Sequence, residues 1–262
     1  MDALRIERDD DLLRITLARP DSRNAFDASL IEELAEAFVD VGKARAVVLA
    51  GDGKSFCAGA DIEWMRRSAE LTHDENIADA NALRRMFDAI DTCPAPVIAL
   101  VQGHALGGGA GLVATADIAI AHERASFAFS EVKLGIIPAV ISPYALRKIG
   151  ESAARRYFVT GERFDAATAL RIGLVHDVTS DLARALDAIV GELRTAAPRA
   201  ARHAKRLVLD RPDGPETARR IAERRTSEEG QEGLRAFCDG GVPGSPGFAS
   251  WSPPAPEQDR AD

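Results

Sequence analysis

Near the start of the chain, apolar and polar residues alternate. Residues 4–8 and 12–17 follow this period of two on either side of an acidic turn at residues 9–11. Such a pattern predicts a β-hairpin. A polar loop at residues 19–26 comes next. The chain therefore begins with two paired strands and a loop.

Apolar positions then recur at helical spacing. Asp27 or Ser29 can cap a helix that continues to Val41. Residues 46–50 form a short apolar run that is typical of a buried strand. Small residues then lead into two further helical stretches, which end near Cys93.

A run of glycines marks the centre of the chain. The apolar residues 95–101 predict a buried strand, and Gly107, Gly108 and Gly109 lead from it into a helix of small residues. Glycine lets another group approach the backbone closely, and a helix N-terminus offers unpaired N–H groups. The turn is either a place to stabilise negative charge or only a tight turn packed on a sheet.

A weak internal repeat includes this turn. Strand, small-residue turn and helix occur at residues 46–65 and again at 96–115, and a third strand unit follows at 117–135. The simplest arrangement is one sheet wound from repeated units, with the turns gathered along one edge, where ligands tend to bind. The rest is mainly helical, with one short strand at 173–178. Helices are expected at residues 142–149, 151–159, 165–172, 181–196, 199–210 and 215–238.

Composition narrows the classes of partner. The chain has 262 residues, 46% of them hydrophobic, which is enough for one sizeable core. Its formal net charge of −8 disfavours nucleic acid and anionic membranes, and its apolar runs are too short to span a bilayer. Three widely spaced cysteines favour a reducing cytoplasm over a disulfide framework. The five histidines lack ligand spacing, so we expect no metal.

Four segments together resemble one known family. Residues 19–26 (RPDSRNAF), 56–62 (FCAGADI), 103–111 (GHALGGGAG) and 129–138 (FSEVKLGIIP) are similar, in order, to loops of the crotonase superfamily, the enoyl-CoA hydratases and isomerases. The stretch from Glu151 to Val175 resembles the trimer-forming helical part of that family.

The resemblance implies an α/β fold, a crotonase-like spiral of repeated β-β-α units with a helical C-terminal trimerisation region. We assign residues 1–195 to the spiral core with the acyl-CoA site and residues 196–240 to the C-terminal helices, and we expect a disordered tail at 241–262. The resemblance also implies a homo-oligomer, either a trimer or a hexamer. It implies an acyl-CoA thioester as the partner, with no nucleic acid, no membrane and no cofactor.

The chemistry of this family places negative charge on a thioester oxygen. Two backbone N–H groups can hold such an oxyanion, and small residues let the thioester approach them. By resemblance, the donors are the amides of Ala58 and Gly108. Glu131 stands at the position of one of the two glutamates that hold water in the hydratases, and it is expected to act as general acid and base.

The position of the second glutamate is Gly111, which cannot accept a proton. Either a bulky acyl group needs the space, or a close helix–strand contact needs the small residue. After Pro138, residues 139–144 (AVISPY) replace the glycine-rich stretch of many members. Together with Gly111 and Cys57, they look more like the branched-chain side of the family, which includes methylglutaconyl-CoA hydratases.

The remaining candidates concern binding. The resemblance assigns Arg23 to the CoA phosphates and the backbone of Ala25 to the adenine. Asp61 is expected to cap a helix beside the pocket, and His104 either touches the acyl chain or is simply packed. The other substrate-binding candidates are Phe26, Ala60, Ile62, Gly107, Gly111, Ile137 and Pro138.

These expectations combine into a hydro-lyase that adds or removes water across the 2,3 bond of an enoyl-CoA, with a branched, methylglutaconyl-like acyl group as the finer expectation. The alternative reaction is Δ3-Δ2 enoyl-CoA isomerisation, because one carboxylate suffices to move a proton between two carbons. The alternative of another class is a non-catalytic acyl-CoA-binding protein. Glu131 argues against that class, because a binding protein needs no proton carrier.

Overall fold

The structure, a computed structural model, describes residues 3–9 and 11–239. Contacts divide the chain into two compact units, Met1–Val190 and Gly191–Asp262. The division falls within the helix α7 (Leu182–Thr195). The tail expected at residues 241–262 lies outside the described residues.

The described part of the first unit contains two sheets. The larger has the strand order β1 (Leu4–Asp9), β2 (Leu12–Leu17), β3 (Ala46–Gly51), β4 (Val97–Val101), β6 (Ile118–His122) and β9 (Asp177–Thr179). The pair β1–β2 is antiparallel, as the predicted hairpin requires, and the other neighbours are parallel. The smaller sheet consists of β5 (His104–Leu106), β7 (Ser126–Ala128) and β8 (Phe164–Asp165).

The expectation of a single sheet was therefore wrong. The chain leaves β4 through Gly103, whose φ is +60° and whose Cβ would lie 1.9 Å from the carbonyl oxygen of Lys54. Only glycine fits this turn, and it redirects the next three residues into the smaller sheet. The sequence pattern gave no sign of this second direction, because β5 is too short to show a period of two.

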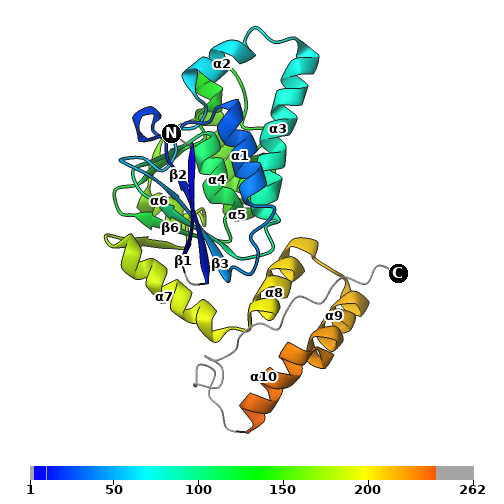
Figure 1. Cartoon of the computed structure of the whole chain (residues 1–262). Helices are drawn as coiled ribbons and strands as arrows, with labels where there is room; N and C mark the ends of the chain where they lie inside the picture. Colours follow the sequence, from blue (N-terminus) through cyan, green and yellow to red (C-terminus); the bar gives the residue numbers. More distant parts are fainter. Residues whose placement is uncertain (1–2, 10, 240–262) are drawn as a thin grey trace. The chain divides into compact units, whose positions relative to one another are not determined.

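Four helices pack next to one another beside the larger sheet (Figure 1). They are α1 (Ala28–Ala37), α3 (His73–Asp91), α4 (Gly108–Thr115) and α5 (Ser142–Thr160). Two shorter helices, α2 (Ile62–Ser68) and α6 (Ala166–Arg171), complete the described helices that lie wholly within this unit. The expected break between two helices at Gly150 is confirmed, because Gly150 interrupts α5 with a φ of +68°.

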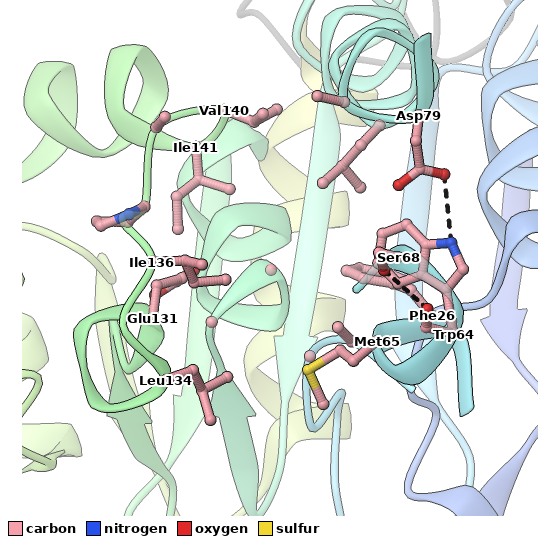
Figure 2. A pocket seen from close by; sticks show the side chains of 18 of the residues that line it. Phe26, Trp64, Met65, Ser68, Asp79, Glu131, Leu134, Ile136, Val140 and Ile141 are labelled. Carbon is pink, nitrogen blue, oxygen red and sulfur yellow. Dashed lines mark hydrogen bonds between the residues drawn. The ribbon is translucent and has the colours of Figure 1, made fainter. Parts of the chain in front are cut away.

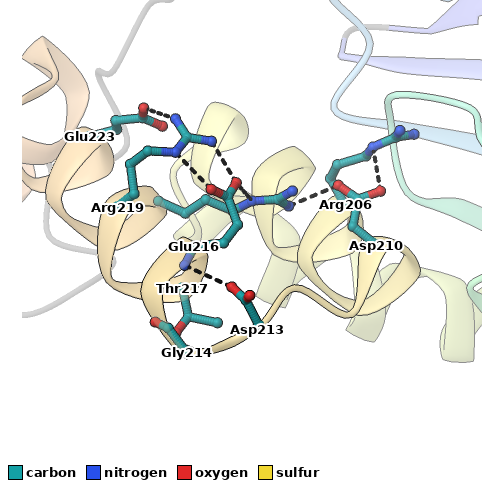
Figure 3. Close-up of polar contacts among 9 residues, drawn as sticks. Arg206, Asp210, Asp213, Gly214, Glu216, Thr217, Arg219 and Glu223 are labelled. Carbon is teal, nitrogen blue, oxygen red and sulfur yellow. Dashed lines mark hydrogen bonds and ion pairs between the residues drawn. The ribbon is translucent and has the colours of Figure 1, made fainter.

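The described part of the second unit beyond α7 contains α8 (Pro198–Asp210), α9 (Gly214–Thr226) and α10 (Glu228–Cys238). The single helix expected at 215–238 was wrong, because Ser227 adopts an extended conformation and its hydroxyl caps α10 by accepting from the amide of Gly230. Arg206 pairs with Asp210 (Figure 3). Arg220 also pairs with Asp210 and reaches Glu216. The pair between Arg220 and Asp210 joins α8 to α9, and the other two lie within one helix each.

A carboxylate supplied from a distance caps α8. The side chain of Glu229 is buried, and its two oxygens accept hydrogen bonds from the amides of Arg199 and Ala200, each at 2.9 Å. The guanidinium of Arg224 donates to the same carboxylate at 2.7 Å. Negative charge at a helix N-terminus is stabilising, so α10 contributes to the start of α8.

None of the helices in the described ranges combines the length and the apolar character that a bilayer crossing requires.

One buried side chain holds the loops at the end of β3. Asn24 has no exposed surface and a φ of +57°, a conformation that asparagine tolerates better than most residues. Its amide nitrogen donates to the carbonyl oxygens of Asp52, Ser55 and Phe56 at 2.9, 2.9 and 3.1 Å. Its amide oxygen accepts from the backbone of Arg19 at 2.9 Å. The loop at residues 19–26 is thereby joined to the loop after β3.

We predict that Asn24→Ala lowers the free energy of unfolding by about 2–4 kcal/mol, because it leaves several buried backbone groups without partners and places alanine at positive φ. Urea denaturation measures this change. Asn81→Ala is the matched control, since the side chain of Asn81 donates to Ile77 and accepts from Arg84 within its own helix, and its cost should stay below about 1 kcal/mol. Equal costs for the two variants would contradict the prediction.

Candidate active site

A cavity of about 830 Å³ lies in the first unit. It is lined by α2, α3, residues 58–60, residues 107–108 and the segment 130–141 after β7. Figure 2 shows Glu131, Ile136 and Ile141 on one side and Trp64 and Asp79 on the other. Most of the lining side chains are apolar. The predicted site residues that line it are Phe26, Ala58, Ala60, Ile62, Gly107, Gly108, Glu131, Ile137 and Pro138.

A short parallel bridge determines which amides face this cavity. Phe26 pairs with Ala60: the amide of Phe26 donates to the carbonyl of Gly59 at 2.8 Å, and the amide of Asp61 donates to the carbonyl of Phe26 at 2.7 Å. In this pattern the amide of Ala60 points away from Phe26. Among the described residues it has no hydrogen-bond partner, and Ala60 lines the cavity.

The assignment of an oxyanion donor to Ala58 was therefore wrong. The amide of Ala58 donates to the carbonyl oxygen of Arg23 at 3.0 Å, so its hydrogen is already used. Ala60, which the sequence analysis assigned only to binding, has the available amide. The resemblance identified the correct loop. Which residue of that loop has an unpaired amide depends on the hydrogen bonds that the loop makes with Arg23 and Phe26.

The second predicted donor, Gly108, has a free amide. Gly108 is the first residue of α4, where backbone N–H groups have no acceptor within the helix, and no described residue accepts from it. The segments that carry the two amides are in contact, since a Cβ on Gly59 would lie 3.8 Å from the nitrogen of Gly108. Two unpaired amides from adjacent segments thus border one cavity, beside the positive end of a helix.

Glu131 begins a 3₁₀ helix, Glu131–Leu134, on the same wall. Its Oε2 atom is buried and has no hydrogen-bond partner among the described residues. Burial raises the pKa of this carboxyl above its ordinary value of 4.5, and a hydrogen bond from its own backbone partly opposes the shift. A partly desolvated carboxylate without a charge partner is suited to take up and release a proton.

The two departures from the family pattern, Gly111 and the segment 139–144, are in contact. A Cβ on Gly111 would lie 2.4 Å from Cγ2 of Ile141 and 3.0 Å from Cζ of Phe87. Gly111 is buried and does not line the cavity, whereas Ile141 does. A close contact therefore requires the small residue, as the second explanation held, but the expected strand partner was wrong: the neighbours are Phe87 of α3 and Ile141, which precedes α5. Ile141 belongs to the AVISPY segment and fills the space in which a side chain at position 111 would begin.

Several other predicted residues lie outside the cavity lining. His104 pairs with β7, where its Nδ1 lies 2.7 Å from Oγ of Ser126, and it does not line the cavity, which favours the packing alternative over contact with the acyl chain. Asp61 caps α2 as predicted by accepting from the amides of Glu63 and Trp64. Burial raises the pKa of the Cys57 thiol to about 12, which agrees with a packing role.

The two residues expected to meet CoA lie in the loop held by Asn24. Arg23 has an exposed side chain that pairs with no described residue. The amide of Ala25 donates to Ser22 at 3.2 Å, and its carbonyl accepts from Arg19 at 2.9 Å. Both polar groups of Ala25 are thus engaged within the loop, and Arg23 is the better placed of the two for an anionic ligand.

Sequence reasoning missed several residues of the cavity lining, and two of them bear on the chemistry. Ile141 carried a signal, because it lies in a segment already noted as unusual. Ser130 lines the cavity next to Glu131 and carried none, since a serine after a strand is common in loops. Among the described residues, no group of three or more His, Cys, Asp or Glu side chains is placed to hold a metal ion.

Comparison with known proteins agrees with this architecture. The sequence model of the enoyl-CoA hydratase/isomerase family matches residues 7–239. The crystal structure of an enoyl-CoA hydratase from Shewanella pealeana superposes with a TM-score of 0.88 at 43% identity, covering 93% of this chain and 96% of that one. Pseudomonas aeruginosa AtuE gives a TM-score of 0.88 at 37% identity, covering 95% of this chain and 100% of that one. The enoyl-CoA hydratase AKT6-1 of Alternaria alternata is 32% identical over 87% of this chain and 78% of its own length.

The chain therefore belongs to the enoyl-CoA hydratase/isomerase family within the crotonase superfamily. It has the crotonase fold and is an enzyme of that family.

We predict that Gly111→Ala destabilises the protein by about 1–3 kcal/mol, because the overlap with Ile141 costs more than the gain in helix propensity of about 1 kcal/mol. Ile141→Ala alone should cost about 2–5 kcal/mol through the cavity that it leaves. The double variant should cost less than the sum, because each change relieves the other. A urea double-mutant cycle measures this coupling, and simple additivity would contradict the packing described here.

Proposed function

We propose that the protein catalyses the reversible addition of water to the 2,3 double bond of an enoyl-CoA thioester. The observation that carries the proposal is that the unpaired amides of Ala60 and Gly108 and the buried carboxylate of Glu131 border one cavity. This set provides a place for negative charge and a proton carrier beside it, as the hydration of an unsaturated thioester needs.

The two amides supply the electrostatic part of the reaction. When water attacks C3, the electrons of the double bond move toward the thioester, and its oxygen becomes negative. Fixed N–H donors stabilise that charge without a titratable group, and one such donor typically contributes about 10²–10³ in rate. The apolar lining keeps the local dielectric low, which strengthens both hydrogen bonds.

Glu131 supplies the proton transfers. As a carboxylate it accepts a proton from the attacking water, and it then returns that proton to C2 as the enolate collapses. The carboxylate is regenerated, one water is consumed, and no electron leaves the substrate, so the reaction requires neither a metal nor a redox cofactor. A general acid and base of this kind contributes about 10²–10⁴ in rate.

The walls of the cavity support a branched acyl group. Leu83, Ile136 and Ile141 present apolar surface toward the space between α3 and the 136–141 segment. The finer expectation of a methylglutaconyl-like group also needs a cation for the second carboxylate. Arg66 is the one lysine or arginine among the described lining residues, and Arg23 remains the candidate for the CoA phosphates.

The second unit supports the proposal of a homo-oligomer, trimer or hexamer. Its helices expose large apolar side chains, which in a monomer would face water. They are Leu207, Val208, Ile221, Leu234 and Phe237, exposed by 41–72%.

A second candidate reaction is Δ3-Δ2 enoyl-CoA isomerisation. The observation that favours it is the contact between Gly111 and Ile141, which leaves Glu131 as the carboxylate on that wall. Isomerisation requires one base to carry a proton from one carbon to another, and it needs the same oxyanion donors.

Product mass separates the two reactions. Purified protein is incubated with crotonyl-CoA, a 3-enoyl-CoA and methylglutaconyl-CoA, and each product is followed by mass spectrometry. We expect the 2-enoyl thioesters to gain one water. Unchanged masses on all three, together with a shifted double bond in the 3-enoyl thioester, would replace hydration by isomerisation.

We predict that Glu131→Gln lowers turnover by more than about 10²-fold while acyl-CoA binding persists, because the amide keeps the shape of the side chain but accepts no proton. Stopped-flow or coupled assays measure turnover, and calorimetry with a saturated acyl-CoA measures binding. Glu32→Gln is the control, since Glu32 lies exposed on α1. Near-normal hydration by Glu131→Gln would overturn the proposed function.

The raised pKa of Glu131 predicts an acid limb in kcat/KM that lies above pH 4.5. Hydration needs the carboxylate, so the rate falls as the pH drops through that pKa. A raised carboxyl pKa makes the folded state bind its proton more tightly, so this group favours folding at low pH and does not cause acid unfolding. Circular dichroism should therefore stay constant across the limb, and an acid limb at or below 4.5 would contradict the prediction.

A further inference from the structure

The contact between Gly111 and Ile141 raises a question about the attacking water. A water molecule that donates one hydrogen to Glu131 still has a second hydrogen to orient. At position 111, the nearest atoms among the described residues are apolar atoms of Ile141 and Phe87. The second hydrogen bond must therefore come from another polar group that borders the cavity.

Most polar side chains of the lining are on the opposite wall and are already engaged. Ser68 donates to the carbonyl of Trp64 at 2.7 Å, and Asn76 donates to the carbonyls of Leu71 and Thr72, each at 3.1 Å. Asp79 accepts from the indole of Trp64 at 3.3 Å. Figure 2 shows Ser68 and Asp79 across the cavity from Glu131.

Ser130 is on the same wall as Glu131 and precedes it in the chain. It occupies the N-cap position of the 3₁₀ helix, where a serine hydroxyl usually accepts from a backbone amide. Its φ and ψ of −90° and 1° are not the extended values of a capping residue, and its hydroxyl makes no cap hydrogen bond. Among the described residues, Oγ of Ser130 has no hydrogen-bond partner.

Gly107 shows how close the two side chains are. A Cβ on Gly107 would lie 3.4 Å from Oε1 of Glu131 and 3.9 Å from Oγ of Ser130. Both oxygens thus border the same small space beside the Gly107 backbone, one residue before the free amide of Gly108. A larger residue at 107 would fill that space, and the positive φ of +52° also favours glycine there.

We propose that Ser130 is a positioning residue that holds the attacking water together with Glu131. This inference rests on the proposed hydration and deepens it. The water donates one hydrogen to the carboxylate of Glu131 and the other to Oγ of Ser130, which directs an oxygen lone pair at C3.

The steps balance with Ser130 unchanged. The bond between the water oxygen and C3 forms as the electrons of the double bond move to the thioester oxygen. The first hydrogen passes to Glu131 and from there to C2. The second hydrogen stays on the new hydroxyl group and remains donated to Ser130, which keeps its own proton throughout.

A partial reaction without attacking water separates positioning from a structural role. Glu131 can remove and return the proton at C2 of a saturated thioester, and in D₂O this exchanges hydrogen for deuterium. The exchange needs Glu131 and the two amides but no water at C3. Butyryl-CoA is the probe for exchange, followed by NMR, and crotonyl-CoA or methylglutaconyl-CoA, whichever the wild type hydrates faster, is the probe for hydration.

We predict that Ser130→Ala lowers kcat for hydration by about 10- to 100-fold, since a misplaced nucleophile costs up to about 10²-fold. KM and the rate of exchange should each stay within about threefold of the wild type. Ser130→Gly should give the same pattern, which guards against a folding defect of one variant. Ser29→Ala, which removes an exposed hydroxyl from α1, should change neither rate.

The remaining outcomes overturn one proposal or the other. If Ser130→Ala keeps its hydration rate, or loses hydration and exchange equally, Ser130 does not position the water. Neither result affects the proposal that the protein hydrates enoyl-CoA with Glu131 as the acid and base. If Glu131→Gln retains hydration, the proposed function itself fails, whatever the Ser130 variants do.

Discussion

The site depends on the hydrogen bonds of Asn24. This one buried amide binds four backbone groups and joins the loop before α1 to the loop after β3. With those loops joined, Arg23 occupies the amide of Ala58, and Phe26 takes the backbone groups on either side of Ala60. The amide of Ala60 is then left for a ligand. The hydrogen bonds of Asn24, which take no part in the reaction, therefore determine which backbone amide faces the cavity unpaired.

The second donor depends on glycine for a related reason. At Gly109, a Cβ would lie 2.3 Å from the carbonyl oxygen of Cys57, so the first turn of α4 can approach the Cys57–Ala60 loop only without a side chain. A parallel bridge between Cys57 and Ala105 also ties the same loop to the smaller sheet. Rigid backbone on both sides keeps the amides fixed before any ligand arrives, which is the condition for electrostatic stabilisation without reorganisation.

Much of this arrangement could be predicted from the sequence. The features that could not be predicted depend on contacts between residues far apart in the chain or on strands too short to show a pattern. Periodicity predicted the hairpin and the buried strands. Residue type and family context predicted the cap at Asp61, and residue type left the first cap open between Asp27 and Ser29, of which Asp27 is the one observed. Periodicity placed a strand in the unit at residues 117–135 that includes β7, but it missed the second sheet, whose strands are two or three residues long. The choice between Ala58 and Ala60 could not be made from the sequence, because it depends on hydrogen bonds from a distant loop. Gly111 and the AVISPY segment were both noticed as departures, yet only their contact shows that they are one feature.

That contact also constrains how the sequence of such an enzyme can change over time. A lineage that gained a larger residue at position 111 first would have to accommodate it against Ile141, which is buried and branched and has little freedom to move. Shortening Ile141 first opens the space and makes the later change tolerable. The route between forms with one and two carboxylates is therefore ordered, and the residue that must change first is not the one that performs the chemistry.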